Sequence, residues 1–154
     1  MKYPRANSKK TLRSDATVLI EACAGLASRM TARRVTQFLE HEISASGLSL
    51  AQLGLMAHVA AATDDTIGAL ADRAGLDQST LSRNLRALQT DGLVEITIVD
   101  ADLRRRSVWL TEQGAIRLER AIPLWRRATE KLGEHISLDA ARRLARQTCK
   151  LPVD

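Results

Sequence analysis

Residues 67–94 read IGALADRAGLDQSTLSRNLRALQTDGLV. Apolar residues recur at helical spacing on both sides of Gly75, and a glycine suits the left-handed backbone that ends a helix. Thr66 and Asp77 are residue types that cap helix N-termini. We therefore predict helices over residues 67–74 and 78–90 joined by a short turn, which is a helix-turn-helix.

The periodicity changes directly after the second of these helices. Residues 93–99 and 107–110 are rich in β-branched and aromatic side chains and predict two strands. The charged segment 100–106 joins them as a hairpin loop. A helix-turn-helix followed at once by a charged hairpin is the plan of a winged helix.

The helix over residues 78–90 has two chemically different faces. Leu81, Leu85 and Leu88 share one face and predict packing against the preceding helix. The opposite face supplies short or forked hydrogen-bond donors, of which arginine can grip guanine and glutamine can pair with adenine. The alternative is an ordinary solvated helix face. The candidate DNA contacts are Gln78, Ser79, Ser82, Arg83 and Arg86.

The hairpin loop adds a second candidate contact. Arginine at a hairpin tip can enter the minor groove, where negative potential is enhanced if the groove is narrow. We expect Asp102 to pair with one of the three arginines at positions 104–106 and so to shape the tip. Arg105 is included among the expected DNA contacts.

Long helices flank this region. Residues 14–45 carry an apolar stripe that includes Leu19, Leu26 and Met30 and predict one helix of about 46 Å. A compact monomer of this size has a radius of gyration of only about 15 Å, so such a helix argues for a partner chain. A break at Gly25 would weaken that argument.

The remaining segments are also mainly helical. Ser49 and Gln52 form a capping box, Thr111 caps a long helix that Pro123 should kink, and Ser137 or Asp139 starts a final helix. The predicted fold class is mainly α with a small β-hairpin wing: a winged helix-turn-helix plus a helical dimerisation region.

Composition narrows the function classes. The 154 residues suffice for one domain, and no apolar run approaches the roughly 18 residues of a membrane span. Two cysteines cannot build a disulfide framework, which favours a reducing cytosol. The net charge of +5 equals the charge of the first 13 residues, so we expect a basic disordered arm that either contacts a polyanion or is a passive tail.

The stretch 67–94, the later Asp102-Leu-Arg104 and the run LTEQG at 110–114 resemble the MarR family of transcriptional regulators. The resemblance covers about residues 15–135. It implies an obligate homodimer in which the first and last helices of both chains interlace. It also implies repression, less often activation, of a nearby promoter through double-stranded DNA with an inverted-repeat operator. A small aromatic or lipophilic effector, a metal or an oxidant commonly releases the DNA.

The resemblance also assigns regions and residues. It implies dimerisation helices over 14–47 and 112–154 and a winged-helix DNA-binding region over 49–111. Ser79, Thr80, Ser82 and Arg83 match the family's DNA-contacting stretch, although Thr80 can instead serve the first helical turn. Asp102 and Arg104 match the pair in the family's wing.

The signal that releases DNA is weakly encoded. The family's effector pocket usually lies between the winged helix and the dimer region, where Met56, His58, Trp109 and Trp125 are candidate lining residues; each is otherwise core or surface. The oxidant-sensing branch of the family has a cysteine in its first helix, as here at Cys23. The alternative is therefore a thiol-based regulator, with Cys149 of the other chain as a resolving partner.

Other chemistry has little support. The three histidines, His41, His58 and His135, are isolated from further metal ligands, and no phosphate-binding glycine loop or nucleophile motif is present. We expect no metal, no cofactor, no enzymatic activity and a cytoplasmic location. A helical interaction module that does not bind DNA and a small enzyme remain as rival classes.

Overall fold

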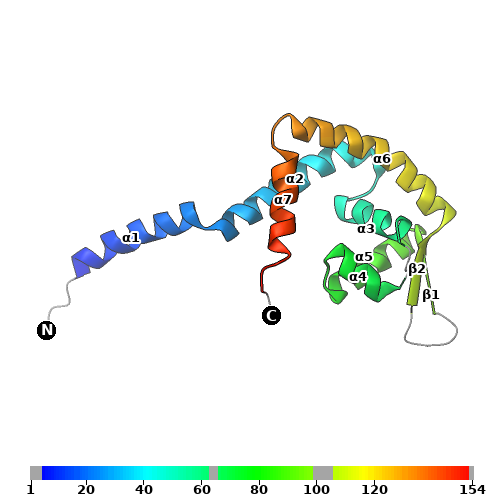
Figure 1. The fold of residues 1–154 in the computed structure, drawn as a ribbon, viewed down its shortest axis with the longest axis horizontal. Coiled ribbons are helices and arrows are strands. Elements are labelled where there is room, and N and C mark those ends of the chain that lie inside the picture. The colour runs from blue at the N-terminus through cyan, green and yellow to red at the C-terminus, as the bar shows by residue number, and fades with distance from the viewer. Residues whose placement is uncertain (1–4, 63–65, 99–105, 153–154) are drawn as a thin grey trace. The chain divides into compact units, whose positions relative to one another are not determined.

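The computed structural model describes residues 5–62, 66–98 and 106–152. These residues form seven α-helices and one hairpin, arranged as in Figure 1, so the predicted fold class, mainly α with a β-hairpin, is confirmed. The chain divides into two compact units, Met1–Gln37 and Phe38–Asp154.

The N-terminal unit differs from the prediction at both ends of its first helix. Helix α1 spans Arg5–Ala22 and α2 spans Ala24–Ile43. Helix α1 thus begins at Arg5 rather than at residue 14 as predicted, because no glycine or proline interrupts residues 5–13, a run rich in good helix formers such as alanine, lysine and arginine. The expected single helix is also interrupted, at Cys23 rather than at Gly25.

Apolar side chains of this unit lie on its surface. Six large ones are between 44% and 69% exposed in the single chain: Leu12, Val18, Leu19, Ile20, Leu26 and Met30. A surface of this kind marks an interaction site more often than a solvated face. The apolar stripe of the sequence is thus present on α1 and α2, but this unit does not cover it.

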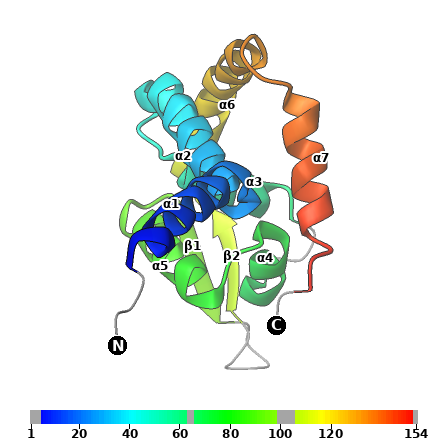
Figure 2. The ribbon, with the colours of Figure 1, turned by 90° about the vertical axis from the view of Figure 1, so that its left-hand side faces the viewer.

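The second unit is built around three short helices and the hairpin. Helices α3 (Leu50–Ala60), α4 (Ile67–Ala74) and α5 (Gln78–Thr90) precede strands β1 (Val94–Ile98) and β2 (Arg106–Leu110). Figure 2 shows α5 beside β1 and α4 beside β2, and α3 also packs against β2. The core comes from the faces that these elements turn toward each other, and its fully buried members include Met56, Leu70, Leu81, Leu85, Leu88 and Val108.

Helix caps explain where these elements begin. Ser49 and Gln52 form the predicted capping box, and Thr66 accepts a hydrogen bond from the Ala69 amide. Gly75 ends α4 in the left-handed backbone conformation, with a φ of 61°, in which a residue with a side chain would be strained. The bounds of α4 and α5 agree with those predicted from the sequence, because caps mark both ends of the turn between them.

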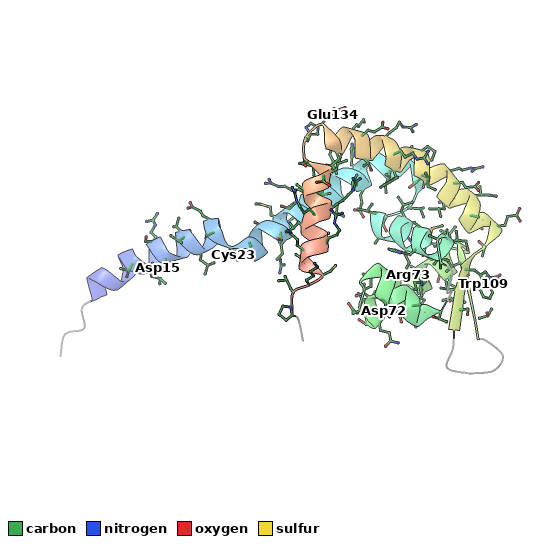
Figure 3. The ribbon with its side chains drawn as sticks, viewed as in Figure 1. Asp15, Cys23, Asp72, Arg73, Trp109 and Glu134 are labelled. Atoms are coloured by element: carbon green, nitrogen blue, oxygen red, sulfur yellow. The ribbon has the colours of Figure 1, made fainter. Side chains whose placement is uncertain are left out.

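The hairpin pairs its strands in antiparallel register from Val94 opposite Leu110 to Ile98 opposite Arg106. Val94 and Val108 are buried, whereas Glu95 and Trp109 form a cross-strand pair on the outer face, where the indole Nε1 donates to Glu95 Oε2 at 3.2 Å. Alternation of side chains between the two faces of the sheet produces this division. Figure 3 places Trp109 on the hairpin.

Helix α6 (Glu112–Gly133) is anchored where it leaves β2. Thr111 caps α6 through the Gly114 amide and also donates to the Gly92 carbonyl at 2.7 Å. A Cβ at Gly114 would lie 1.9 Å from the Leu93 carbonyl oxygen, so only glycine allows this approach. The start of α6 is therefore held directly against the segment that joins α5 to β1.

Two polar contacts fix α6 further along its length. Arg117 Nη1 donates to the Ser46 carbonyl in the 3-10 turn η1 (Ser44–Ser46), and Lys131 pairs with Glu42 at 2.6 Å. The hydrogen bond from Lys131 holds the pKa of Glu42 below its usual value. Helix α6 is continuous through Pro123, and α7 (Leu138–Thr148) follows from the cap Ser137.

Among the described residues, no single helix combines the length and hydropathy needed to cross a bilayer. One bent helix pair in the described part of the chain, Ala24–Ser46 with Leu50–Ala60, passes that test jointly by length and composition.

Candidate nucleic-acid interface

Helix α5 has the two faces that its sequence predicts. Leu81, Leu85 and Leu88 are at most 1% exposed, and α5 packs against α3 and β1. At about 1.5–3 kcal/mol for each fully buried leucine, this face fixes the rotation of the helix about its axis. The opposite face is therefore held outward.

The outward face carries most of the predicted contacts. Thr80 is half-buried, and the other polar candidates on α5 are exposed: Gln78, Ser79, Ser82, Arg83 and Arg86. Neither arginine has a salt-bridge partner among the residues that the structure describes. Two guanidinium groups one helical turn apart are thus available to phosphates or base edges.

The first turn of α5 is organised by the carboxylate of Asp77. Its Oδ1 accepts hydrogen bonds from the Ser79 hydroxyl at 2.6 Å and from the Thr80 amide at 2.8 Å, while Oδ2 accepts the Thr80 hydroxyl at 2.8 Å. The Ser79 hydroxyl, followed by the Thr80 amide and hydroxyl, holds the pKa of Asp77 well below its usual range. Sequence reasoning predicted the cap but missed that both hydroxyls donate to it.

The other predicted DNA contacts belong to the hairpin loop. Asp102, Arg104 and Arg105 lie outside the described residues. The strands on either side of them are ordered by the pairing from Val94 to Leu110, and β1 packs against α5. The strands that flank these residues in the sequence therefore belong to the same unit as the polar face of α5.

Comparisons with known proteins agree with this arrangement. A sequence profile of the MarR family matches residues 46–105. The structure is similar to the DNA complex of the transcriptional regulator MosR from M. tuberculosis, at 31% identity and a TM-score of 0.73 over 84% of this chain and 99% of that one. A MarR-family regulator from Silicibacter pomeroyi gives 30% identity and 0.60 over 88% and 91%. The chain belongs to the MarR family.

Two further comparisons complete the result. The MarR-family fold is shared with the repressor CouR bound to a 23-mer DNA duplex, at 23% identity and a TM-score of 0.72 over 85% of this chain and 93% of that one. No curated protein matches the chain. This MarR-family chain is thus one of a family of transcriptional regulators with a winged-helix fold.

A cavity of about 540 Å³ lies between α3 and α6 of this MarR-family chain. Of the predicted effector residues, His58 and Trp125 line it. Met56 is fully buried in the core, and Trp109 is on the outer face of the hairpin. The sequence analysis missed the other lining residues, although three of them recur with Trp125 at helical spacing on α6. The lining consists of Leu50, Leu53, Gly54, Ala57, His58, Leu118, Ile122, Trp125 and Arg126.

Cys23 lies at the interruption between α1 and α2, as Figure 3 shows, and its side chain is half-buried. Cys149 follows α7 and is exposed. Both are free thiols in the single chain. No group of three or more histidine, cysteine or acidic side chains is placed to hold a metal within the part of the MarR-family chain that the structure describes.

Proposed function

We propose that this chain is a sequence-specific regulator of transcription that binds double-stranded DNA. The observation that carries the proposal is the polar, arginine-bearing face of α5, which is turned outward by three buried leucines next to a hairpin. The DNA-bound MosR, at 31% identity, supports the same use of the fold. Helix α5 is assigned to the major groove and the hairpin loop to the flanking minor groove.

The functional form is proposed to be a homodimer. The uncovered apolar side chains of α1 and α2, together with Leu144 and Leu151 at the C-terminal end, supply surface that a second copy can bury. Residues 14–47 and 112–154 are the proposed dimerisation segments, and residues 49–111 form the DNA-binding region. Two-fold symmetry then requires an inverted-repeat operator with half-sites about 10 bp apart or a small multiple of that spacing.

The protein is further proposed to be a repressor that a small aromatic or lipophilic molecule releases from DNA. The cavity between α3 and α6 has the size of a small-molecule site, and its walls are mostly apolar. His58 and Arg126 are the polar groups that can orient a ligand there. Since α3 also packs against α5, a ligand that shifts α3 would tilt the DNA-binding helix.

The proposed activity is DNA binding rather than catalysis, and the proposed location is the cytoplasm, where the operator DNA lies. Purified protein is titrated into a labelled duplex from the region upstream of its own gene and into a scrambled duplex of equal length. We expect a dimer, by light scattering, that prefers the upstream duplex. If about 6–10 phosphates are contacted, affinity should fall about 10³–10⁵-fold between 50 and 200 mM salt. Equal affinity for both duplexes would favour a helical interaction module instead.

Cys23 supports a second release signal, because its thiol lies at the helix interruption within segment 14–47, which is proposed to dimerise. Oxidation there would change the geometry of that interruption. On this alternative, Cys23→Ser abolishes the loss of DNA binding after peroxide treatment. Cys149→Ser has the same effect only if Cys149 of the other chain is a resolving partner, and it has no effect if Cys23 acts alone. Full peroxide sensitivity in the Cys23 variant excludes a thiol-based release mechanism at this residue.

A further inference from the structure

The hydroxyl of Ser79 has a defined direction of hydrogen bonding. It lies 2.6 Å from Asp77 Oδ1, and an ionised carboxylate can only accept. The proton must therefore belong to Ser79 and point at Asp77. Because the Asp77 pKa is lowered well below its usual range, the carboxylate stays ionised in any ordinary buffer.

A serine whose proton is committed presents only oxygen lone pairs to its surroundings. Ser79 is exposed in the first turn of α5, so those lone pairs face outward. The same holds for Thr80, whose hydroxyl donates to Asp77 Oδ2 at 2.8 Å, but Thr80 is half-buried. Ser79 is consequently committed to accepting, whereas the exposed Gln78 and Ser82 can both donate and accept. The exposed Arg83 and Arg86 can only donate.

An outward acceptor selects among bases by chemistry. In the major groove, cytosine N4 and adenine N6 carry amino donors, whereas guanine presents two acceptors and thymine an acceptor and a methyl group. Phosphate oxygens also only accept, and the Asp77 charge disfavours their approach. To donate to the acceptors of guanine, thymine or phosphate, Ser79 would have to break its short charge-assisted hydrogen bond to Asp77.

We propose that Ser79 recognises an adenine or cytosine through its hydroxyl oxygen as the acceptor, and that Asp77 is the positioning residue that holds the hydroxyl in this state. This inference rests on the proposed function and specifies part of its base preference. It reverses the direction expected from sequence alone, where Ser79 counted as a donor. Arg83 and Arg86 remain the donors for guanine or phosphate.

The test is selection of binding sites from a randomised duplex library by the full-length protein. Wild type should enrich adenine or cytosine at one position of each half-site. Ser79→Ala, which favours helix, should lose that enrichment by about two- to tenfold, the range for one neutral hydrogen bond. Asp77→Gly keeps a residue type that is tolerated at a helix N-cap but removes both carboxylate oxygens. The Ser79 hydroxyl is then free to donate, so guanine or thymine should become tolerated there.

The matched control is Asp91→Asn, which removes the same charge at the other end of α5. It should leave the adenine or cytosine preference unchanged, which separates orientation of the hydroxyl from loss of negative charge near DNA. Circular dichroism of the Asp77 variant checks that α5 still forms.

A second measurement removes only the amino group. In the selected duplex, purine replaces adenine, or pyrimidin-2-one replaces cytosine, at the identified position. Wild type should lose about two- to tenfold in affinity, and Ser79→Ala should lose nothing further. An amino-group effect that persists in Ser79→Ala would overturn the inference. If wild type enriches no sequence at all, the proposed function fails instead.

Discussion

Helices α1 and α5 both carry leucines at helical spacing, but they differ in what covers them. The leucines of α5 are at most 1% exposed, whereas Leu19 and Ile20 of α1 are at least 60% exposed. The apolar face of α5 is completed within one chain, so a single subunit suffices to orient its polar face. The apolar surface of α1 is not completed in this way, and a second copy is the proposed cover.

The largest expected effect is on association. Leu19→Glu should separate the dimer. In a two-fold dimer one substitution removes a leucine from each side of the proposed interface, which should weaken association by about 3–6 kcal/mol. Analytical ultracentrifugation over a concentration series measures the dissociation constant. Thr17→Glu adds the same charge two residues away, on another side of α1, and should remain dimeric. A dimer unchanged by the Leu19 variant would remove α1 from the interface.

The complementary change is in α5. Leu85→Ala should lower the free energy of unfolding by about 2–5 kcal/mol, because the side chain is fully buried and its removal leaves a cavity. Urea denaturation measures this difference. The neighbouring surface substitution Arg86→Ala should shift stability by no more than about 0.5 kcal/mol. Similar losses in both variants would contradict the division of α5 into a packed and an open face.

The polar face of α5 should matter for DNA rather than for stability. Arg83→Ala should weaken operator binding by about 1–3 kcal/mol and relax the base preference, while unfolding is unchanged. Fluorescence anisotropy with the operator and a point-substituted operator measures both quantities. Gln89→Ala, near the other end of the helix, is the control. Unaltered affinity and preference in the Arg83 variant would show that this side chain does not contact bases.

The smallest effect concerns the basic N-terminal segment. Replacing Lys9, Lys10 and Arg13 with glutamine should reduce the slope of log affinity against log salt by about 0.9 for each phosphate that these side chains neutralise. Substitution is preferable to deletion, because α1 begins at Arg5. An unchanged slope would mean that the positive charge of this segment does not reach DNA.

Sequence reasoning succeeded where short-range chemistry decides structure. The caps Ser49, Thr66, Asp77 and Thr111 all begin helices as predicted, because each needs only an amide two or three residues away. It failed at the start of the first helix, which was predicted at residue 14 but lies at Arg5, since the preceding arginine, lysine and leucine side chains favour the helix as well.

The candidate sites divide in the same way. Spacing alone identified the open face of α5, because burial of one side of a helix determines where the other side points. Spacing did not separate His58 and Trp125, which line the cavity, from Met56 in the core and Trp109 on the hairpin. That distinction depends on which helix packs opposite each side chain.

From the sequence by itself follow the helix-turn-helix, the hairpin after it and the family, because caps, turn glycines and periodicity act over a few residues. Only the tertiary structure decided which side chains enclose the cavity between α3 and α6, how closely Gly114 approaches Leu93, and that Asp77 accepts hydrogen bonds from the hydroxyls of Ser79 and Thr80. These features depend on the packing of distant segments and on the rotamers of neighbouring side chains, neither of which residue spacing specifies.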